Sequence, residues 1–96
     1  MNLRQLIVDQ KFEQLNGVNV YLFGSALYND AIPMDVDLAI IYDKYCVSIQ
    51  EVISYRIYLK NIIKEKLNYS SDILLLSIQE EIEAEFLSNA KNYQVI

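Results

Sequence analysis

A long stretch with helical periodicity, residues 47–67, separates two short apolar runs and constrains the fold more than any other feature of the sequence. Its apolar residues recur at the spacing of one helical face. They are Ile49, Val52, Ile53, Ile57, Ile63 and Leu67. A helix between two strands of one sheet normally forms a right-handed crossover, so we predict that the strands at residues 35–42 and 72–77 run parallel.

A further strand is predicted ahead of this pair, at residues 18–23, "VNVYLF". Only residues 24–34 connect it to the strand at 35–42, and so short a connection suits antiparallel pairing. The alternation of helices and strands predicts an α/β fold. We expect a small mixed β-sheet of about three strands flanked by helices, in a single domain over residues 1–96.

Helices are also predicted toward both ends of the chain, over residues 2–15 and 79–91. Gly17 is the expected C-terminal stop of the first of these helices. The residues expected to face the core are Val8, Phe12 and Leu15 in the first helix, with Leu3 and Ile7 adjoining, and Ile82, Phe86 and Ala90 in the last.

Composition and charge restrict the class of protein. Hydrophobic residues make up 53% of the 96 residues, which is too many for a disordered chain. No apolar run is long enough to cross a membrane, and the charged start of the chain lacks the apolar core of a signal peptide. We therefore expect a cytoplasmic protein without membrane association. The net charge of -5 argues against direct nucleic-acid binding.

The residue types present also restrict the chemistry. The sequence contains no histidine and a single cysteine, Cys46, which excludes the usual Cys/His zinc sites and the Ser-His and Cys-His catalytic arrangements. We expect Cys46 to be a small buried apolar residue. Acid–base chemistry must then come from carboxylates, lysine or tyrosine, and oxygen-rich sites for hard cations such as Mg²⁺ remain open.

Two carboxylates, Asp35 and Asp37, lie at the start of the strand predicted over residues 35–42. Because side chains alternate along a strand, both are expected on one face, about 6.5 Å apart along the chain. Two carboxylates on one face repel each other unless a cation lies between them. Oxygen ligands at this spacing suit Mg²⁺ or Mn²⁺, and two such ions would form the metal pair used in phosphoryl and nucleotidyl transfer.

The predicted topology brings three further residues to the same edge. Asp72 opens the next parallel strand and is the candidate third carboxylate. Gly24 and Ser25 follow the antiparallel strand, where glycine permits a close approach of backbone to ligand and Ser25 adds a hydroxyl donor. Backbone N–H groups of a following helical turn would bind phosphate oxygens.

Each of these signals has a simpler interpretation when it is taken alone. Gly-Ser after a strand is usually an ordinary turn, Asp-x-Asp at a strand edge is often a solvated face, and Asp72 is compatible with a plain strand boundary. Most of the tyrosines are expected to lie half-buried with the hydroxyl in water rather than to stack on bases. The combination of signals at one predicted edge favours a site.

The residues Phe23-Gly24-Ser25, followed after nine residues by Asp35-Val36-Asp37-Leu38, resemble the signature of the DNA polymerase β-like nucleotidyltransferase superfamily. That signature is an apolar residue, Gly-Ser, a spacer of about nine to thirteen residues and Asp-apolar-Asp/Glu-apolar. The order and length of the predicted elements extend the resemblance over nearly the whole chain. Its small size resembles the minimal nucleotidyltransferases, many of which are encoded beside a HEPN-domain protein and act as antitoxins of a toxin–antitoxin pair.

The resemblance implies roles for the matching residues. Gly24 and Ser25 would hold the phosphates of the nucleotide, and Asp35 and Asp37 would bind Mg²⁺, with two ions expected when the nucleotide is present. Asp72 would be the third carboxylate, which contributes to the metal site and helps to activate the acceptor hydroxyl. The expected reaction is transfer of a nucleoside monophosphate, with ATP as donor, to a hydroxyl of a HEPN-domain toxin in a hetero-oligomer.

One departure from the family pattern keeps a second function open. Members often carry a basic residue just after Gly-Ser, whereas no Lys or Arg occurs here between Lys11 and Lys44. Cationic help for a triphosphate would then come from a partner chain or from Lys44, Arg56, Lys60 or Lys64. The alternative is a catalytically degenerate protein of this fold that neutralises its partner by binding alone. An antibiotic-modifying type of transferase is disfavoured, because such enzymes usually add a second domain.

Overall fold

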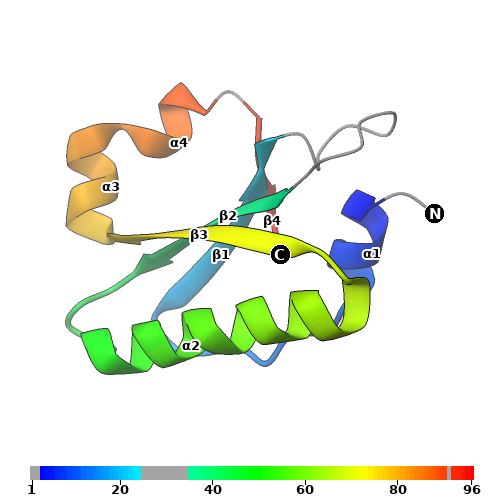
Figure 1. Ribbon diagram of the computed structural model, residues 1–96. Helices are drawn as coiled ribbons and strands as arrows, with labels where there is room; N and C mark the ends of the chain where they lie inside the picture. The colour runs from blue at the N-terminus through cyan, green and yellow to red at the C-terminus, as the bar shows by residue number, and fades with distance from the viewer. Residues whose placement is uncertain (1–2, 25–34, 91) are drawn as a thin grey trace.

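The structure is a computed structural model that describes residues 3–24, 35–90 and 92–96. Within these residues a four-stranded mixed sheet has the strand order β3-β2-β1-β4 (Figure 1). The strands are β1 (Val18–Phe23), β2 (Asp35–Tyr42), β3 (Ser70–Ser77) and β4 (Gln94–Val95). The helices are α1 (Leu3–Asp9), α2 (Ile49–Ile62) with the π-helical turn η2 (Ile63–Leu67), α3 (Ile78–Ala84) and α4 (Phe86–Asn89).

The predicted pairing of the three long strands is confirmed. β1 runs antiparallel to β2, from Val18 opposite Tyr42 to Phe23 opposite Asp37. β3 runs parallel to β2, and α2 with η2 forms the crossover between them. The α/β class and the mixed sheet with flanking helices are therefore confirmed, with one more strand than expected.

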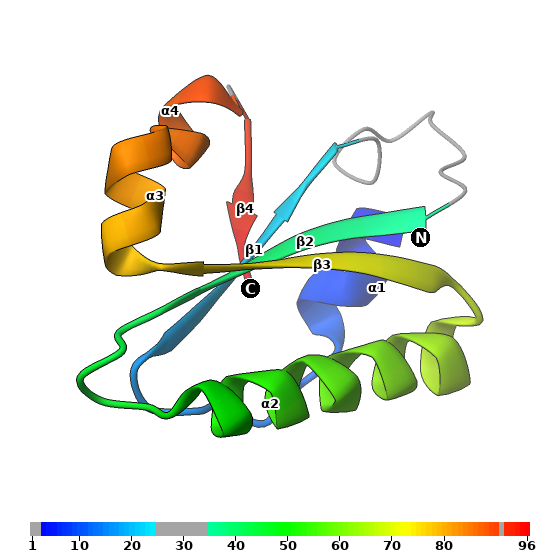
Figure 2. The same ribbon diagram turned by 60° about the vertical axis from the view of Figure 1, so that its left-hand side comes forward.

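Two layers of helices flank the sheet. α2 runs along one face, whereas α3 and α4 lie on the opposite side, as both views of the molecule show (Figures 1 and 2). The main core lies between the sheet and the α1–α2 side, where alternate residues of the strands are fully buried. Its members are Ile7, Val20, Leu22, Val36, Leu38, Ile40, Val47, Val52, Leu59, Ile63 and Ile73.

The opposite face of β2 is buried as well, but only in its second half. Ala39 and Ile41 are buried there, where α3 contacts β2 and β3. Asp35 and Asp37 occupy the same face near the start of the strand. Alternate residues of β2 thus point into the main core. On the other face, the first residues of the strand are polar and only the later ones are buried.

The first helix is shorter than predicted, because it ends at Asp9 rather than near residue 15. Two tyrosines of α2 hold the following segment in a non-helical form. The Glu13 N–H donates to the Tyr58 hydroxyl at 2.9 Å, and the Tyr55 hydroxyl donates to the Glu13 carbonyl at 2.6 Å. Gly17, with φ of 81°, therefore serves the turn into β1 and is not a helix stop, so that expectation was wrong.

The apolar faces of both outer helical segments also differ from the expectation. In α1, Ile7 is buried and Val8 is exposed. In the last segment, Ile82 is exposed, and Glu85 takes a left-handed conformation that divides the expected helix into α3 and α4. The turn brings the Phe86 ring onto Phe23, with 5.4 Å between ring centroids in an edge-to-face arrangement.

β4 was not predicted, because two residues are too few to give a strand pattern. It pairs with the outer edge of β1, Val95 opposite Tyr21 and Gln94 opposite Leu22. The Arg4 guanidinium donates to the Gln94 side chain at 2.7 Å, which connects α1 to this edge.

The buried face of α2 is centred elsewhere than the sequence pattern suggested. Val52, Leu59 and Ile63 face the sheet, whereas Ile49, Ile53 and Ile57 are exposed on one flank of this stripe. At 100° per residue the two sets lie on neighbouring parts of the helix surface, so periodicity alone did not separate them. Cys46 is likewise exposed rather than buried, with its Sγ 3.3 Å from an Asp43 carboxylate oxygen.

The start of α2 provides a test of local stability. Ser48 Oγ accepts a hydrogen bond from the Glu51 N–H at 3.2 Å, and the Glu51 carboxylate accepts one from the Ser48 N–H, which makes a capping box. Ser48→Ala is expected to lower the free energy of unfolding by about 1 kcal/mol. Urea titration should show this loss. Ser54→Ala, an exposed position within the same helix, serves as the control and should cost nothing.

No helix among residues 3–24, 35–90 and 92–96 has the length and apolar character that a membrane span requires.

Candidate active site

The start of β2 places two carboxylates on one face of the sheet. Asp35 is exposed and Asp37 is half-buried, while Val36 and Leu38 point into the core from the opposite face. The alternation predicted from the sequence is therefore present. Burial of Val36 and Leu38 holds the phase of the strand, so the same packing determines the side on which Asp35 and Asp37 project.

The parallel pairing with β3 brings a third carboxylate beside the second. Asp72 is the register partner of Asp37, while Ser70 is the partner of Asp35. β3 begins two residues earlier than predicted, so Asp72 is its third residue and neighbours Asp37 rather than Asp35. Paired residues of adjacent strands lie about 5 Å apart. Asp37 therefore has two carboxylate neighbours, Asp35 along its own strand and Asp72 on the adjacent strand.

Gly24 approaches this carboxylate group from the end of β1. It follows Phe23, the antiparallel partner of Asp37, and its φ is 79°. A Cβ atom built on Gly24 would lie 2.5 Å from Oδ2 of Asp37, so any other residue here would have to displace this carboxylate. Ser25, the other half of the predicted nucleotide-binding pair, lies outside the described residues.

The electrostatics of Asp37 reflect this crowding. Burial raises the pKa of its carboxyl above the ordinary value, and the negative charges of Asp72 and then Asp35 raise it further. Burial and negative neighbours make the charged form of this carboxyl group unfavourable, and a bound cation would offset that cost. The local field therefore suits a cation.

The donor set fits a hard divalent ion in its chemistry. All three side chains offer carboxylate oxygens, the ligands that Mg²⁺ prefers. As the side chains stand, the described part of the chain contains no group of three acidic, histidine or cysteine residues close enough together to hold an ion. Asp35, Asp37 and Asp72 would have to turn toward a common point when they bind one.

The four basic residues considered for a triphosphate lie at different distances from the carboxylates. Lys44 follows the far end of β2, roughly 20 Å from Asp37 at the ordinary rise of a strand, which disfavours it. Arg56 belongs to the middle of α2. Lys60 and Lys64 line a pocket with Ser70, the partner of Asp35, and so lie toward the carboxylate end of the sheet.

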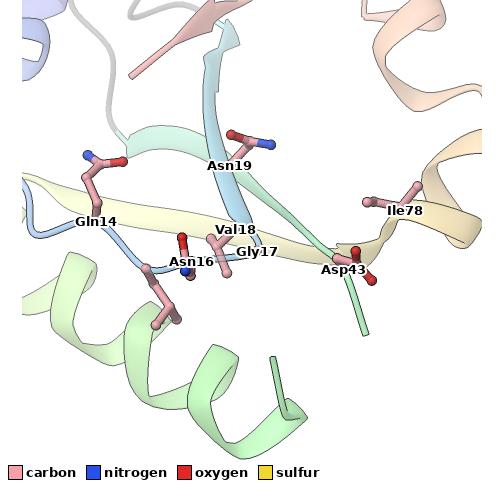
Figure 3. A pocket seen from close by; sticks show the side chains of 8 residues that line it. Gln14, Asn16, Gly17, Val18, Asn19, Asp43 and Ile78 are labelled. Atoms are coloured by element: carbon pink, nitrogen blue, oxygen red, sulfur yellow. The ribbon is translucent and has the colours of Figure 1, made fainter. Parts of the chain in front are cut away.

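A cavity of about 560 Å³ lies at the opposite end of the sheet from the carboxylates. Figure 3 shows its side chains around the segment that enters β1, with Asp43 beyond the end of β2 and Ile78 at the start of α3. Among the described residues that line this cavity, Asp43 alone is titratable, and the two carboxylate oxygens of Asp43 already accept from the Tyr45 N–H and the Cys46 thiol. Sequence reasoning missed this cavity, because amide side chains in a turn carry no recognisable pattern.

A glycine substitution tests the close approach at the site. Gly24→Ala is expected to destabilise the protein by about 1–2 kcal/mol, because alanine at positive φ is strained, and to displace the Asp37 carboxylate. Gly17→Ala is the matched control, since its φ is 81° and its added Cβ would meet Cys46 instead. Both variants should melt earlier in a thermal scan, and only Gly24→Ala should weaken binding of Mg²⁺ or nucleotide. Equal weakening by both would contradict this role of Gly24.

A mixed sheet with glycine after its first strand, Asp-x-Asp at the start of the second and a carboxylate on the parallel third strand defines a domain of the nucleotidyltransferase fold. The family described as "Polymerase beta, Nucleotidyltransferase" matches residues 8–93, and the chain belongs to this family. Membership supports a transferase and nucleotidyl transfer as the general class of activity. No curated protein and no solved structure matches the chain.

Proposed function

We propose that this protein is a Mg²⁺-dependent nucleotidyltransferase that moves a nucleoside monophosphate, with ATP as donor, onto a hydroxyl group of a partner protein. The observation that supports it best is the register of the sheet. It places Asp72 beside Asp37, and Gly24 against the Asp37 carboxylate, within one family domain.

The proposed roles follow from these positions. Asp35 and Asp37, with Asp72, would hold Mg²⁺, which when bound supplies charge neutralisation for the phosphates. The glycine at position 24 lets backbone and phosphate oxygens come close, and Ser25 would add a hydroxyl donor. The acceptor oxygen attacks the α-phosphorus, pyrophosphate leaves with the electron pair of the broken P–O bond, and Asp72 accepts the hydroxyl proton.

For the acceptor we propose a HEPN-domain toxin, bound to this chain as antitoxin in a hetero-oligomer. The resemblance to minimal nucleotidyltransferases supports this choice.

The test is transfer of label from α-labelled ATP. The protein is incubated with ATP, Mg²⁺ and the product of the neighbouring gene, and the label on each chain is measured. Label on the partner is expected, with its loss in the double variant Asp35→Asn, Asp37→Asn. No transfer, or transfer that the double variant leaves unchanged, would overturn the enzymatic proposal.

A second candidate function is neutralisation of the partner by binding alone. It is supported by the absence of Lys and Arg between Lys11 and Lys44 and by three carboxylates that do not converge on one point among the described residues. If it is correct, the complex forms and inhibits the partner equally well without nucleotide and with both aspartates replaced. Loss of inhibition in that double variant would exclude it.

A further inference from the structure

A smaller pocket lies between the end of the crossover helix and the start of β3, and the proposed reaction does not use it. Its volume is about 240 Å³. The lining residues are Lys60, Asn61, Lys64, Tyr69, Ser70 and Ser71. All six side chains carry a hydrogen-bond donor, and none is a carboxylate, although the whole chain has a net charge of -5.

The two lysines of the pocket lie one helical turn apart, and no described carboxylate pairs with either of them. Residues four apart project from the same side of a helix, so Lys60 and Lys64 face one direction. Neither ammonium has a carboxylate within 4.0 Å among the described residues. The acidic residues closest in sequence are Glu65, which is exposed on η2, and Asp72, which projects from the other face of β3.

Lysines in the last turns of a helix also complement the helix dipole, so their presence alone would not define a site. Ser71 supplies the independent observation. Its Oγ is buried and has no hydrogen-bond partner among the described residues. A buried hydroxyl without a partner is costly, and it lies on a residue that lines the same pocket as Lys60 and Lys64.

The chemistry of the lining selects an anion with several acceptor oxygens. Two ammonium groups supply charge, and serine, tyrosine and asparagine side chains supply donors in several directions. A tetrahedral oxyanion offers oxygens on every side, which matches such a lining better than a neutral or cationic ligand. We propose that this pocket binds a phosphate-type oxyanion, either free or as the phosphoryl group of a larger molecule.

The proposal does not depend on nucleotidyl transfer. Asp35 and Asp37 project from the face of the sheet opposite to Ser71, which shares its side with the buried Ile73. Ser70, the partner of Asp35, lies on the carboxylate side, so the pocket spans the β3 edge, while Lys60 and Lys64 belong to the helical segment that covers the Ser71 side. Anion binding here is separable from metal binding there.

The test is a titration of the ¹⁵N-labelled protein with inorganic phosphate in Mg²⁺-free buffer, followed by amide chemical shifts. Saturable shifts centred on residues 60–71 are expected. The double variant Lys60→Gln, Lys64→Gln should raise the Kd at least about tenfold, and Ser71→Ala about threefold. Lys66→Gln, on the same helical end but outside the pocket lining, is the matched control and should leave the Kd within about twofold.

Three further measurements separate the outcomes. Thermal scans establish that each variant is folded, and Asp35→Asn with Asp37→Asn should leave phosphate binding intact. Parallel titrations with pyrophosphate and ATP distinguish a free phosphate from a phosphoryl group of a nucleotide as the preferred ligand. Absence of saturation up to about 10 mM phosphate, or equal weakening by Lys66→Gln and the pocket variants, would overturn the site.

Discussion

Asp37→Asn is expected to abolish nucleotidyl transfer and, at the same time, to raise the melting temperature. Transfer should fall at least about 100-fold. Replacing a residue that only hydrogen-bonds to a metal ligand typically costs about 10–100-fold, and a proposed ligand itself should cost more. Stability should rise because the amide is nearly the same shape and carries no charge, which removes the repulsion from Asp72 and Asp35.

The stability gain should depend on pH with a definite sign. The pKa of Asp37 is raised in the folded protein above its unfolded value, so the folded state loses stability relative to the unfolded state as the pH rises through the folded pKa. The asparagine variant lacks this loss. Its advantage in melting temperature should be full above the folded pKa of Asp37 and should vanish below the unfolded pKa of about 4.

Thermal scans without metal at several pH values, together with the labelled-ATP assay, measure both effects. Asp9→Asn is the matched control, because Asp9 is an exposed aspartate on α1 whose Oδ1 accepts a hydrogen bond that the amide oxygen of asparagine preserves. It should change neither activity nor stability. A destabilised Asp37→Asn protein, or one with intact transfer, would contradict the assignment of this carboxylate to a cation site.

Leu38→Ala is expected to produce the largest loss of stability of any single truncation in the sheet. Leu38 has no exposed surface and lies on the central strand between β1 and β3. Removing its side chain leaves a cavity that should cost about 3–4 kcal/mol, or roughly 12–30 °C in melting temperature for a domain of this size. That is a large part of the total stability of a small domain.

The same substitution on the edge strand supplies the control. Leu74 is 43% exposed and projects from the other face of the sheet, so Leu74→Ala should cost less than about 1 kcal/mol. Chemical denaturation of both variants against the parent protein measures the difference. Similar losses in the two variants would show that the core is not centred on the α2 side of β2.

The parts of the fold that the sequence predicted well are those with one dominant physical cause. β1 and β2 have the predicted bounds because short, mainly apolar segments bounded by turn residues favour strands, and the crossover helix required β3 to be parallel. The positions of Asp35, Asp37 and Asp72 on one face followed from the strand period and the topology. Their roles as metal ligands remain proposals.

The incorrect predictions concern features determined by contacts between distant residues. Helix α1 ends early because Tyr55 and Tyr58 hold the backbone of Glu13, a contact that spans more than 40 residues. The break at Glu85 depends on packing of Phe86 against Phe23 rather than on a local helix breaker. The exposure of Cys46 follows from its turn after β2, where no described element covers it.

The alternation of side chains along β2 has a consequence for how this sequence can vary. Inserting or deleting one residue within the strand would exchange its two faces, so that Asp35 and Asp37 would point inward and Val36 and Leu38 outward. Substitutions can remove activity and leave the fold intact, as asparagine at position 37 should do. A change of length within these eight residues cannot alter the acidic pair without altering the core, because the aspartates and the buried residues alternate along one strand.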